Sequence, residues 1–319
     1  MTGPIPHWPG RMVALPAGEQ VYVAETPEPV PNRSKELVLC VHGMAGAATN
    51  WTDFMAELAP GFSCAAVDLP GSGFSPPPAA KRGYTIRALA GTVIRLIEAL
   101  DRGPVHLVGN SMGGAVSVRV AASRPDLLRT LTLVSPALPD LRVRRELLQF
   151  PIAGLPVFGE RMMRRTQLTP AENRVAGVVA TCYHDPAAMH SDRFWQDVAE
   201  LKRRDELDYS ATTLSRAART LVAESLRPHR YSLWGAAERI TVPALVTFGS
   251  NDTLVNPRLA VPARRAFRGA TVIVLPQTGH VAQMERPELV ARLFREMVDR
   301  TRAGGDVTGN SGRHDPVDA

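Results

Sequence analysis

Cysteine is scarce in this sequence, and the few cysteines follow no pattern. The chain has 3 cysteines in 319 residues, an odd number without the regular spacing of a disulfide framework. Cys40 and Cys64 lie in apolar, strand-like runs, whereas Cys182 stands apart from both. Structural disulfides belong to oxidising compartments, so the sequence predicts buried thiols in a reducing compartment.

The sequence also lacks the long apolar run that a membrane span needs. Nowhere do about 18 apolar residues follow one another. Residues 1–9 show neither the charged start nor the apolar centre of a secretory signal peptide. We therefore expect no stable membrane insertion and a cytoplasmic protein.

A long block of lysine and arginine is missing as well. The chain has 37 basic and 31 acidic residues, spread along its length, with a formal net charge of +6. A nucleic-acid-binding arm would concentrate its basic residues, so this distribution argues against a nucleic-acid partner. The sequence carries no metal, nucleotide or flavin motif, and we expect no cofactor.

What the sequence does contain is enough apolar material for a sizeable core. Hydrophobic residues make up 45% of the chain, which suffices for one large α/β domain or two smaller ones. Leu37–Val41 is a continuous apolar run, as expected of a central strand covered by helices on both faces. From Ile86 to Leu100 the apolar residues recur at helical spacing. Further strand-like runs lie at 64–68, 105–110, 131–134, 243–248 and 271–275.

The most informative stretch presents one serine between a strand and a helix. Residues 105–110 form an apolar run, Ser111 follows, and the chain then resumes with helical spacing. Gly109 and Gly113 flank the serine two positions away on either side, where side chains would collide in a sharp turn. This G-x-S-x-G pattern resembles the nucleophile elbow of the α/β-hydrolase family. The resemblance implies an α/β fold with a mostly parallel central sheet, helices on both faces and an inserted helical cap.

A serine nucleophile needs a base, and the base needs a carboxylate to orient it. His280 and Asp252 each follow a strand-like run, and with Ser111 they give the chain order serine, aspartate, histidine of this family. We predict these three residues as the catalytic triad. Asp140, just past the preceding strand, is the rival acid, because some members of the family place it there.

The loop His42-Gly43-Met44-Ala45-Gly46 follows the first central strand. In the family, a loop of this kind supplies half of an oxyanion hole, where backbone N–H groups face a developing negative charge. We expect the N–H groups of Met44 and Met112 to be the two donors. Gly43, with Gly109 and Gly113, supports the loops, and His42 has a structural role through hydrogen bonds.

After Pro136 the strand pattern stops for about a hundred residues, and the intervening segment shows helical spacing instead. We predict a hydrolase core from 1–135 and 240–302, a helical cap or lid from 136–239, and a disordered tail from 303–319. Cap aromatics suggest an apolar pocket: Phe150, Phe158, Phe194 and Trp195. Six arginines flank the segment 147–158, where they form either a solvated basic face or a contact with anionic lipid or an acidic substrate: Arg142, Arg144, Arg145, Arg161, Arg164 and Arg165.

These features favour an esterase or lipase-like serine hydrolase that acts on an apolar small-molecule ester. Two alternatives stay open. The segments 109–114 and 279–283 are similar to the meta-cleavage-product hydrolases, which split a carbon–carbon bond, although Val281 stands where those enzymes usually have tryptophan. A ligand-binding receptor on a hydrolase scaffold is the other alternative. The sequence leaves the oligomeric state open.

Overall fold

The computed structural model describes residues 5–27, 35–140, 154–155 and 158–307 of the chain. At its centre lies an eight-stranded sheet with the strand order β1-β2-β4-β3-β5-β6-β7-β8. The strands are β1 Gly10–Ala14, β2 Gln20–Glu25, β3 Leu37–Val41, β4 Ser63–Val67, β5 Val105–Asn110, β6 Leu128–Val134, β7 Ala244–Gly249 and β8 Thr271–Leu275. β2 pairs antiparallel with β1 and β4, and every later pairing is parallel. The predicted α/β fold with a mostly parallel sheet is thereby confirmed.

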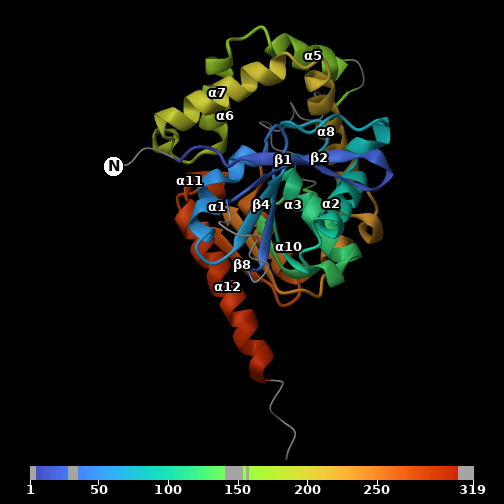
Figure 1. Cartoon of the computed structure of the whole chain (residues 1–319), viewed down its shortest axis with the longest axis vertical. Helices are drawn as coiled ribbons and strands as arrows, with labels where there is room; N and C mark the ends of the chain where they lie inside the picture. The colour runs from blue at the N-terminus through green and yellow to red at the C-terminus, as the bar shows by residue number, and fades with distance from the viewer. Residues whose placement is uncertain (1–4, 28–34, 141–153, 156–157, 308–319) are drawn as a thin grey trace, which may run out of the picture.

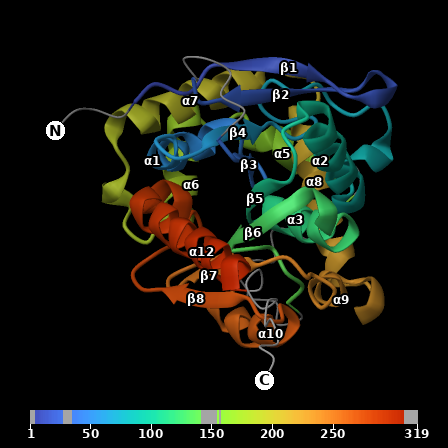
Figure 2. The ribbon, with the colours of Figure 1, turned by 60° about the horizontal axis from the view of Figure 1, so that its bottom comes forward.

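Helices cover both faces of this sheet (Figure 2). They are α1 Thr52–Leu58, α2 Ile86–Leu100, α3 Met112–Ser123, α9 Leu233–Ala237, α10 Ala260–Ala266, α11 Ala282–Glu285 and α12 Pro287–Val307. Alternate residues of β3 point to opposite faces, so Leu39 packs with α2 and α3, and Cys40 packs with α1 and α12. All five residues of β3 are buried, as a central parallel strand requires.

Among the described residues between β6 and β7, four further helices gather at one end of the molecule (Figure 1). They are α5 Phe158–Thr166, α6 Ala171–Cys182, α7 Ser191–Asp205 and α8 Ser210–Ser225. A small apolar cluster that includes Val175, Val179 and Val198 joins α6 to α7. We refer to these four helices as the cap helices. Short 3-10 turns are η1 Pro16–Gly18, η2 Ala48–Trp51, η3 Lys81–Tyr84, η4 Pro125–Leu127, η6 Pro186–Ala188, η7 His229–Tyr231 and η8 Pro257–Leu259.

The end of the chain departs from the prediction. The tail was predicted to begin at residue 303, but α12 continues to Val307. The two glycines in this last turn, Gly304 and Gly305, disfavour a helix by only about 1 kcal/mol each, which does not end it. The rest of the predicted tail, 308–319, lies outside the described residues. Within the described part of the chain, no helix combines the length and apolarity that crossing a membrane demands.

Candidate active site

Ser111 occupies a strained turn between β5 and α3. Its backbone has φ 53° and ψ −117°, a conformation that residues with a side chain rarely adopt. The turn needs glycine beside it, because a Cβ on Gly113 would lie 2.2 Å from the carbonyl oxygen of Val41. A Cβ on Gly109 would likewise lie 2.6 Å from the Gly113 carbonyl oxygen. Ser111 itself remains partly exposed at the top of the sheet.

His280 and Asp252 form a buried pair. Nδ1 of His280 lies 2.9 Å from Oδ2 of Asp252, and both side chains are nearly inaccessible to solvent. The other carboxylate oxygen of Asp252 accepts hydrogen bonds from the N–H groups of Leu254 and Val255, both at 2.8 Å. Burial would raise the pKa of Asp252, but the His280 imidazole and these donors hold the pKa below its ordinary value. Asp252 is therefore an anion that can orient the imidazole.

The rival acid, Asp140, has different neighbours. It lines the same cavity as His280, and its Oδ2 lies 3.5 Å from Nδ2 of Asn256. The imidazole of His280 makes its hydrogen bond with Asp252 instead.

The loop that carries His280 is attached both to the sheet and to the cap helices. Asn110, which directly precedes Ser111, donates from Nδ2 to the carbonyl oxygens of His280 at 3.1 Å and Val134 at 3.0 Å. The backbone N–H of His280 donates to the carbonyl oxygen of Cys182, at the end of α6, at 2.6 Å. Glu285 accepts from the N–H of Gly279 at 2.7 Å. These contacts fix the position of His280 relative to the strand that presents Ser111.

Sequence reasoning missed these anchoring residues. Asn110 offered a signal, because an amide side chain at the end of a buried strand must find hydrogen-bond partners. Cys182 offered none, since its contact with His280 joins segments about 100 residues apart in the chain, and the contacts of Glu285 with His184 and Asp185 span a similar separation. Glu285 also accepts from the N–H groups of His184 and Asp185, which begin the connection between α6 and α7.

The backbone of the loop 42–46 passes directly beside the serine. A Cβ on Gly43 would lie 3.1 Å from Cβ of Ser111, so a larger residue would fit at this approach only if its neighbours moved by a few tenths of an ångström. The loop closes as a turn in which the N–H of Gly46 donates to the Gly43 carbonyl oxygen at 3.1 Å, with Ala45 at φ 62°. Met44 lies within this turn.

Two further groups shape this end of the sheet. His42 is fully buried, with Nδ1 2.7 Å from the carbonyl oxygen of Gly43, and its Nε2 accepts from the N–H of Leu69 at 2.9 Å. Burial lowers the pKa of His42 to about 4, so the ring is neutral near pH 7. Met112 is the first residue of α3, where N–H groups have no acceptor within the helix and the helix dipole favours negative charge.

A cavity of about 590 Å³ connects these groups. Ser111, His280 and Met44 lie in its core wall, and its cap wall comes from α6, α7 and α8. The described cap residues that line it include Val175, Val178, Val179, Cys182, Asp197, Glu200, Leu201, Arg204, Leu221 and Val222. The volume suits a medium-sized organic molecule, and the wall is largely apolar.

The aromatic residues that suggested an apolar pocket do not supply this wall. Phe158 and Trp195 are 56% and 57% exposed, and Phe194 packs beside Trp195 outside the cavity. No residue of α5 lines the cavity, and α7 presents Asp197, Glu200, Leu201 and Arg204 to it instead, because helical spacing places neighbouring residues on different faces. Phe150 lies outside the described residues, as do Arg142, Arg144 and Arg145. The other three flanking arginines are exposed on α5: Arg161, Arg164 and Arg165.

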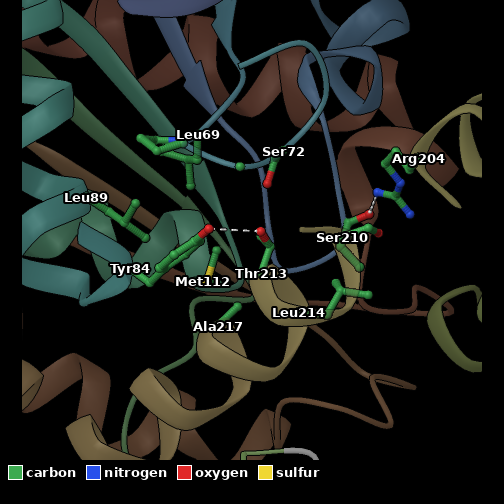
Figure 3. Close-up of a pocket in the computed structure, with 13 residues that line it drawn as sticks. Leu69, Ser72, Tyr84, Leu89, Met112, Arg204, Ser210, Thr213, Leu214 and Ala217 are labelled. Atoms are coloured by element: carbon green, nitrogen blue, oxygen red, sulfur yellow. Dashed lines mark hydrogen bonds between the residues drawn. The ribbon is translucent and has the colours of Figure 1, made fainter. Parts of the chain in front are cut away.

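A second, much smaller cavity of about 30 Å³ is lined by Met112, which does not line the first cavity. Figure 3 shows Tyr84 and Met112 on one side of it and Arg204 on the other. The Tyr84 hydroxyl lies 3.2 Å from Oγ1 of Thr213, which joins the core to α8. The cavity has room for a water molecule or two but not for a substrate. Arg204 and Ala45 line both cavities, so they form part of the partition between them.

Comparison with known proteins places these features in context. A sequence model described as the alpha/beta hydrolase fold matches residues 36–287. The dihydrolipoyllysine-residue acetyltransferase component of the acetoin cleaving system of Pseudomonas putida is 32% identical over 255 residues, which cover 79% of this chain. The chain spans only 60% of that relative's length.

Two other proteins match over nearly their whole length. The pimeloyl-(acyl-carrier protein) methyl ester esterase of Neisseria meningitidis serogroup B is 26% identical over 275 residues, covering 85% of this chain and 95% of that protein. The structure of 2-hydroxy-6-oxo-6-phenylhexa-2,4-dienoate hydrolase from Rhodococcus sp. strain RHA1 gives a TM-score of 0.72 at 18% identity. That alignment covers 91% of this chain and 100% of the other, and at such identity the likeness concerns the fold.

Proposed function

Because this chain belongs to the alpha/beta hydrolase family, we propose that it is a serine hydrolase that cleaves carboxylic esters through an acyl-enzyme intermediate. The observation that carries the proposal is the 2.9 Å contact between Asp252 and His280, because His280 lines the same cavity as Ser111. The strained backbone of Ser111 supports it, because strain of this kind collects at functional sites.

In the proposed reaction, Oγ of Ser111 attacks the ester carbonyl while His280 takes the hydroxyl proton. The N–H groups of Met44 and Met112 stabilise the negative charge that develops on the carbonyl oxygen. His280 then gives the proton to the departing alcohol, and the acyl group stays on Ser111. A water molecule, deprotonated by His280, releases the acid and restores the serine. Asp252 keeps the imidazole oriented and stabilises its cation.

The cavity indicates the class of ester. Its aliphatic walls favour an apolar acyl or alcohol group of medium size, which displaces water when it binds. The Neisseria meningitidis relative carries the name of a methyl ester esterase, which agrees with ester chemistry in this family. We therefore propose a small-molecule ester as the substrate.

The proposal is tested with p-nitrophenyl esters graded in acyl length. We expect steady-state turnover by the wild-type protein and a fall in kcat of roughly 10⁴- to 10⁶-fold in Ser111→Ala and in His280→Ala. Asp252→Asn should also lose most activity. Asp140→Asn is the matched control, because it is the same substitution at an aspartate that lines the cavity of Ser111 and His280, and it should retain most activity. Retention of most activity in Ser111→Ala would contradict the proposal. A stoichiometric burst without turnover would instead favour a ligand-binding receptor.

Hydrolysis of a carbon–carbon bond is the second candidate. It is favoured by the similarity of segments 109–114 and 279–283 to the meta-cleavage-product hydrolases. Such substrates carry a carboxylate, and among the described wall residues Arg204 is the arginine available to bind it. One nitrogen of this guanidinium already donates to the carbonyl oxygen of Ala45. Decay of a coloured ring-fission product, without turnover of any ester, would favour this reaction.

A further inference from the structure

The cap wall of the catalytic cavity contains a carboxylate that the proposed reaction does not use. Asp197 belongs to α7 and lines the cavity together with Ser111 and His280. Its side chain is half-buried, and no described residue donates a hydrogen bond to its carboxylate or forms an ion pair with it. In an unliganded protein, a sheltered carboxylate without a partner is costly, which makes it a position for a ligand to satisfy.

The charged residues beside Asp197 are already engaged elsewhere. Both carboxylate oxygens of Glu200, one turn along α7, accept from Arg203 at 2.7 Å. Arg204, two turns along, donates to the carbonyl oxygen of Ala45 at 2.5 Å. Arg193, one turn before, pairs with Asp53 of α1. Asp197 is therefore the uncommitted charge on the cavity face of α7.

The balance of charge in the cavity points to the sign of the missing partner. Among the charged residues of α7 in its described wall, Glu200 is paired with Arg203 and Arg204 donates to a backbone carbonyl oxygen, whereas the carboxylate of Asp197 has no described ion-pair partner. Burial raises the pKa of Asp197 to about 6, in spite of the opposing influence of Arg204 and Arg193, so the group is an anion above that pH. A cationic group that enters the cavity would be attracted by this carboxylate.

We propose that Asp197 is a specificity-determining residue that binds an ammonium group of the substrate, so that the preferred esters carry a cationic amine on the part that reaches the cap. The inference rests on the proposed ester hydrolysis and adds the charge of the substrate to it. The aliphatic walls bind the rest of the molecule, and Asp197 selects the charged member among esters of equal size.

The test compares two substrates of equal shape that differ in charge. Butyrylthiocholine carries a trimethylammonium group, and S-(3,3-dimethylbutyl) thiobutyrate has a neutral tert-butyl group in its place. Release of the thiol is measured at pH 8, where Asp197 is ionised. We expect the wild-type protein to prefer the cationic substrate. Asp197→Asn should reduce the ratio of kcat/KM for the cationic substrate to kcat/KM for the neutral one by roughly tenfold, mainly through KM, because the trimethylammonium group has no N–H and is attracted by charge alone. Asp197→Glu should retain most of the preference.

Asp192→Asn is the matched control, because it removes the same charge from an exposed position of the same helix, outside the cavity. An unchanged ratio in Asp197→Asn, or an equal fall in Asp192→Asn, would overturn the inference. Failure of the proposed function looks different, since both substrates would then resist hydrolysis by the wild-type protein. In that case the role of Asp197 is tested by calorimetry, which measures binding of butyrylcholine and of 3,3-dimethylbutyl butyrate to the Ser111→Ala variant. Equal affinity for the two ligands would overturn the role of Asp197. Tighter binding of butyrylcholine, lost when Asp197→Asn is added, would support it.

Discussion

The imidazole of His280 faces a carboxylate, whereas that of His42 lies between a carbonyl oxygen and a backbone N–H. An ionised Asp252 accepts the Nδ1 proton of His280 and leaves Nε2 able to receive another proton. Nε2 of His42 accepts from Leu69, so Nδ1 must carry the proton that bonds to Gly43, and the ring has no place for a second proton. In the proposed reaction His280 is the histidine that takes up a proton, whereas His42 serves the fold only while neutral.

The neutral state of His42 leads to a stability prediction. Its pKa is about 4 in the folded protein and about 6.5 in an unfolded chain, so the unfolded state binds the extra proton first as the pH falls. The stabilisation is complete above pH 6.5 and is lost between pH 6.5 and pH 4, by about 3 kcal/mol in all. We expect the stability advantage of the wild type over His42→Asn to shrink across this window, measured by urea denaturation at pH 7.5 and 4.5.

Exposed His184 provides the control for this experiment. His184→Asn should leave the difference from wild type constant between the two pH values. A wild-type advantage over His42→Asn that stays constant with pH would show that His42 does not titrate in this way.

At the scale of elements, α7 is fastened to the core near both of its ends. Near its start, Arg193 donates to both carboxylate oxygens of Asp53 at 3.0 and 2.5 Å. Near its end, Arg203 donates to the carbonyl oxygen of Gly73 at 2.7 Å. Arg204 donates to Ala45 within the loop that passes beside Ser111. The helix therefore couples the position of the cap to the backbone of the proposed oxyanion loop.

This coupling predicts that Arg204→Met lowers kcat. Without the guanidinium, the turn that Gly46 N–H closes on the Gly43 carbonyl oxygen, and that contains Met44, is less firmly held. A misplaced Met44 N–H weakens binding of the transition state more than binding of the substrate. We expect a fall in kcat of roughly tenfold on a neutral p-nitrophenyl ester, with KM changed much less. Arg204→Lys, which keeps a donor at this position, should recover part of the loss.

Lys202→Met is the comparison variant, since Lys202 is exposed and pairs with Glu172 on the cap surface. It should match the wild type in both constants. A rise in KM without a change in kcat in Arg204→Met would assign Arg204 to substrate binding and not to positioning of the loop.

The elements also show how far a sequence can predict a structure of this kind. β3 and α2 begin and end where their patterns indicated, because a buried parallel strand and an amphipathic helix each leave a clear period in the sequence. The elbow could be found because its strain restricts the neighbouring positions to glycine. The sequence could not show that Asp197 and Arg204 face the cavity. Polar residues occur on several faces of their helix, and only the packing of the cap helices decides which face lines the cavity.

At the scale of the whole molecule, α8 connects the cap helices to the core through buried polar contacts. Oγ1 of Thr220 accepts from the N–H of Ile86, the first residue of α2, at 3.1 Å. Glu224 accepts from Arg119 of α3 at 2.6 Å, and the two side chains are 4% and 9% exposed. Arg119 also donates to the carbonyl oxygen of Tyr231 at 2.5 Å. A buried ion pair of this kind couples the stability of the cap helices to that of the core.

The pair therefore predicts opposite results for single and double replacements. Glu224→Leu leaves the Arg119 guanidinium buried without its counter-charge, which should cost about 3 to 5 kcal/mol of unfolding free energy. Replacing both residues by leucine removes the stranded charge and should recover most of that loss, because the desolvation cost disappears with it. Glu98→Leu, which breaks the exposed pair with Arg124, should change the stability far less. Urea denaturation, followed by tryptophan fluorescence and by circular dichroism, measures each free energy of unfolding.

Coincident transitions in the wild type would show that the cap helices and the core unfold as one unit. A double variant as unstable as Glu224→Leu would contradict the assignment of the cost to the unpaired arginine.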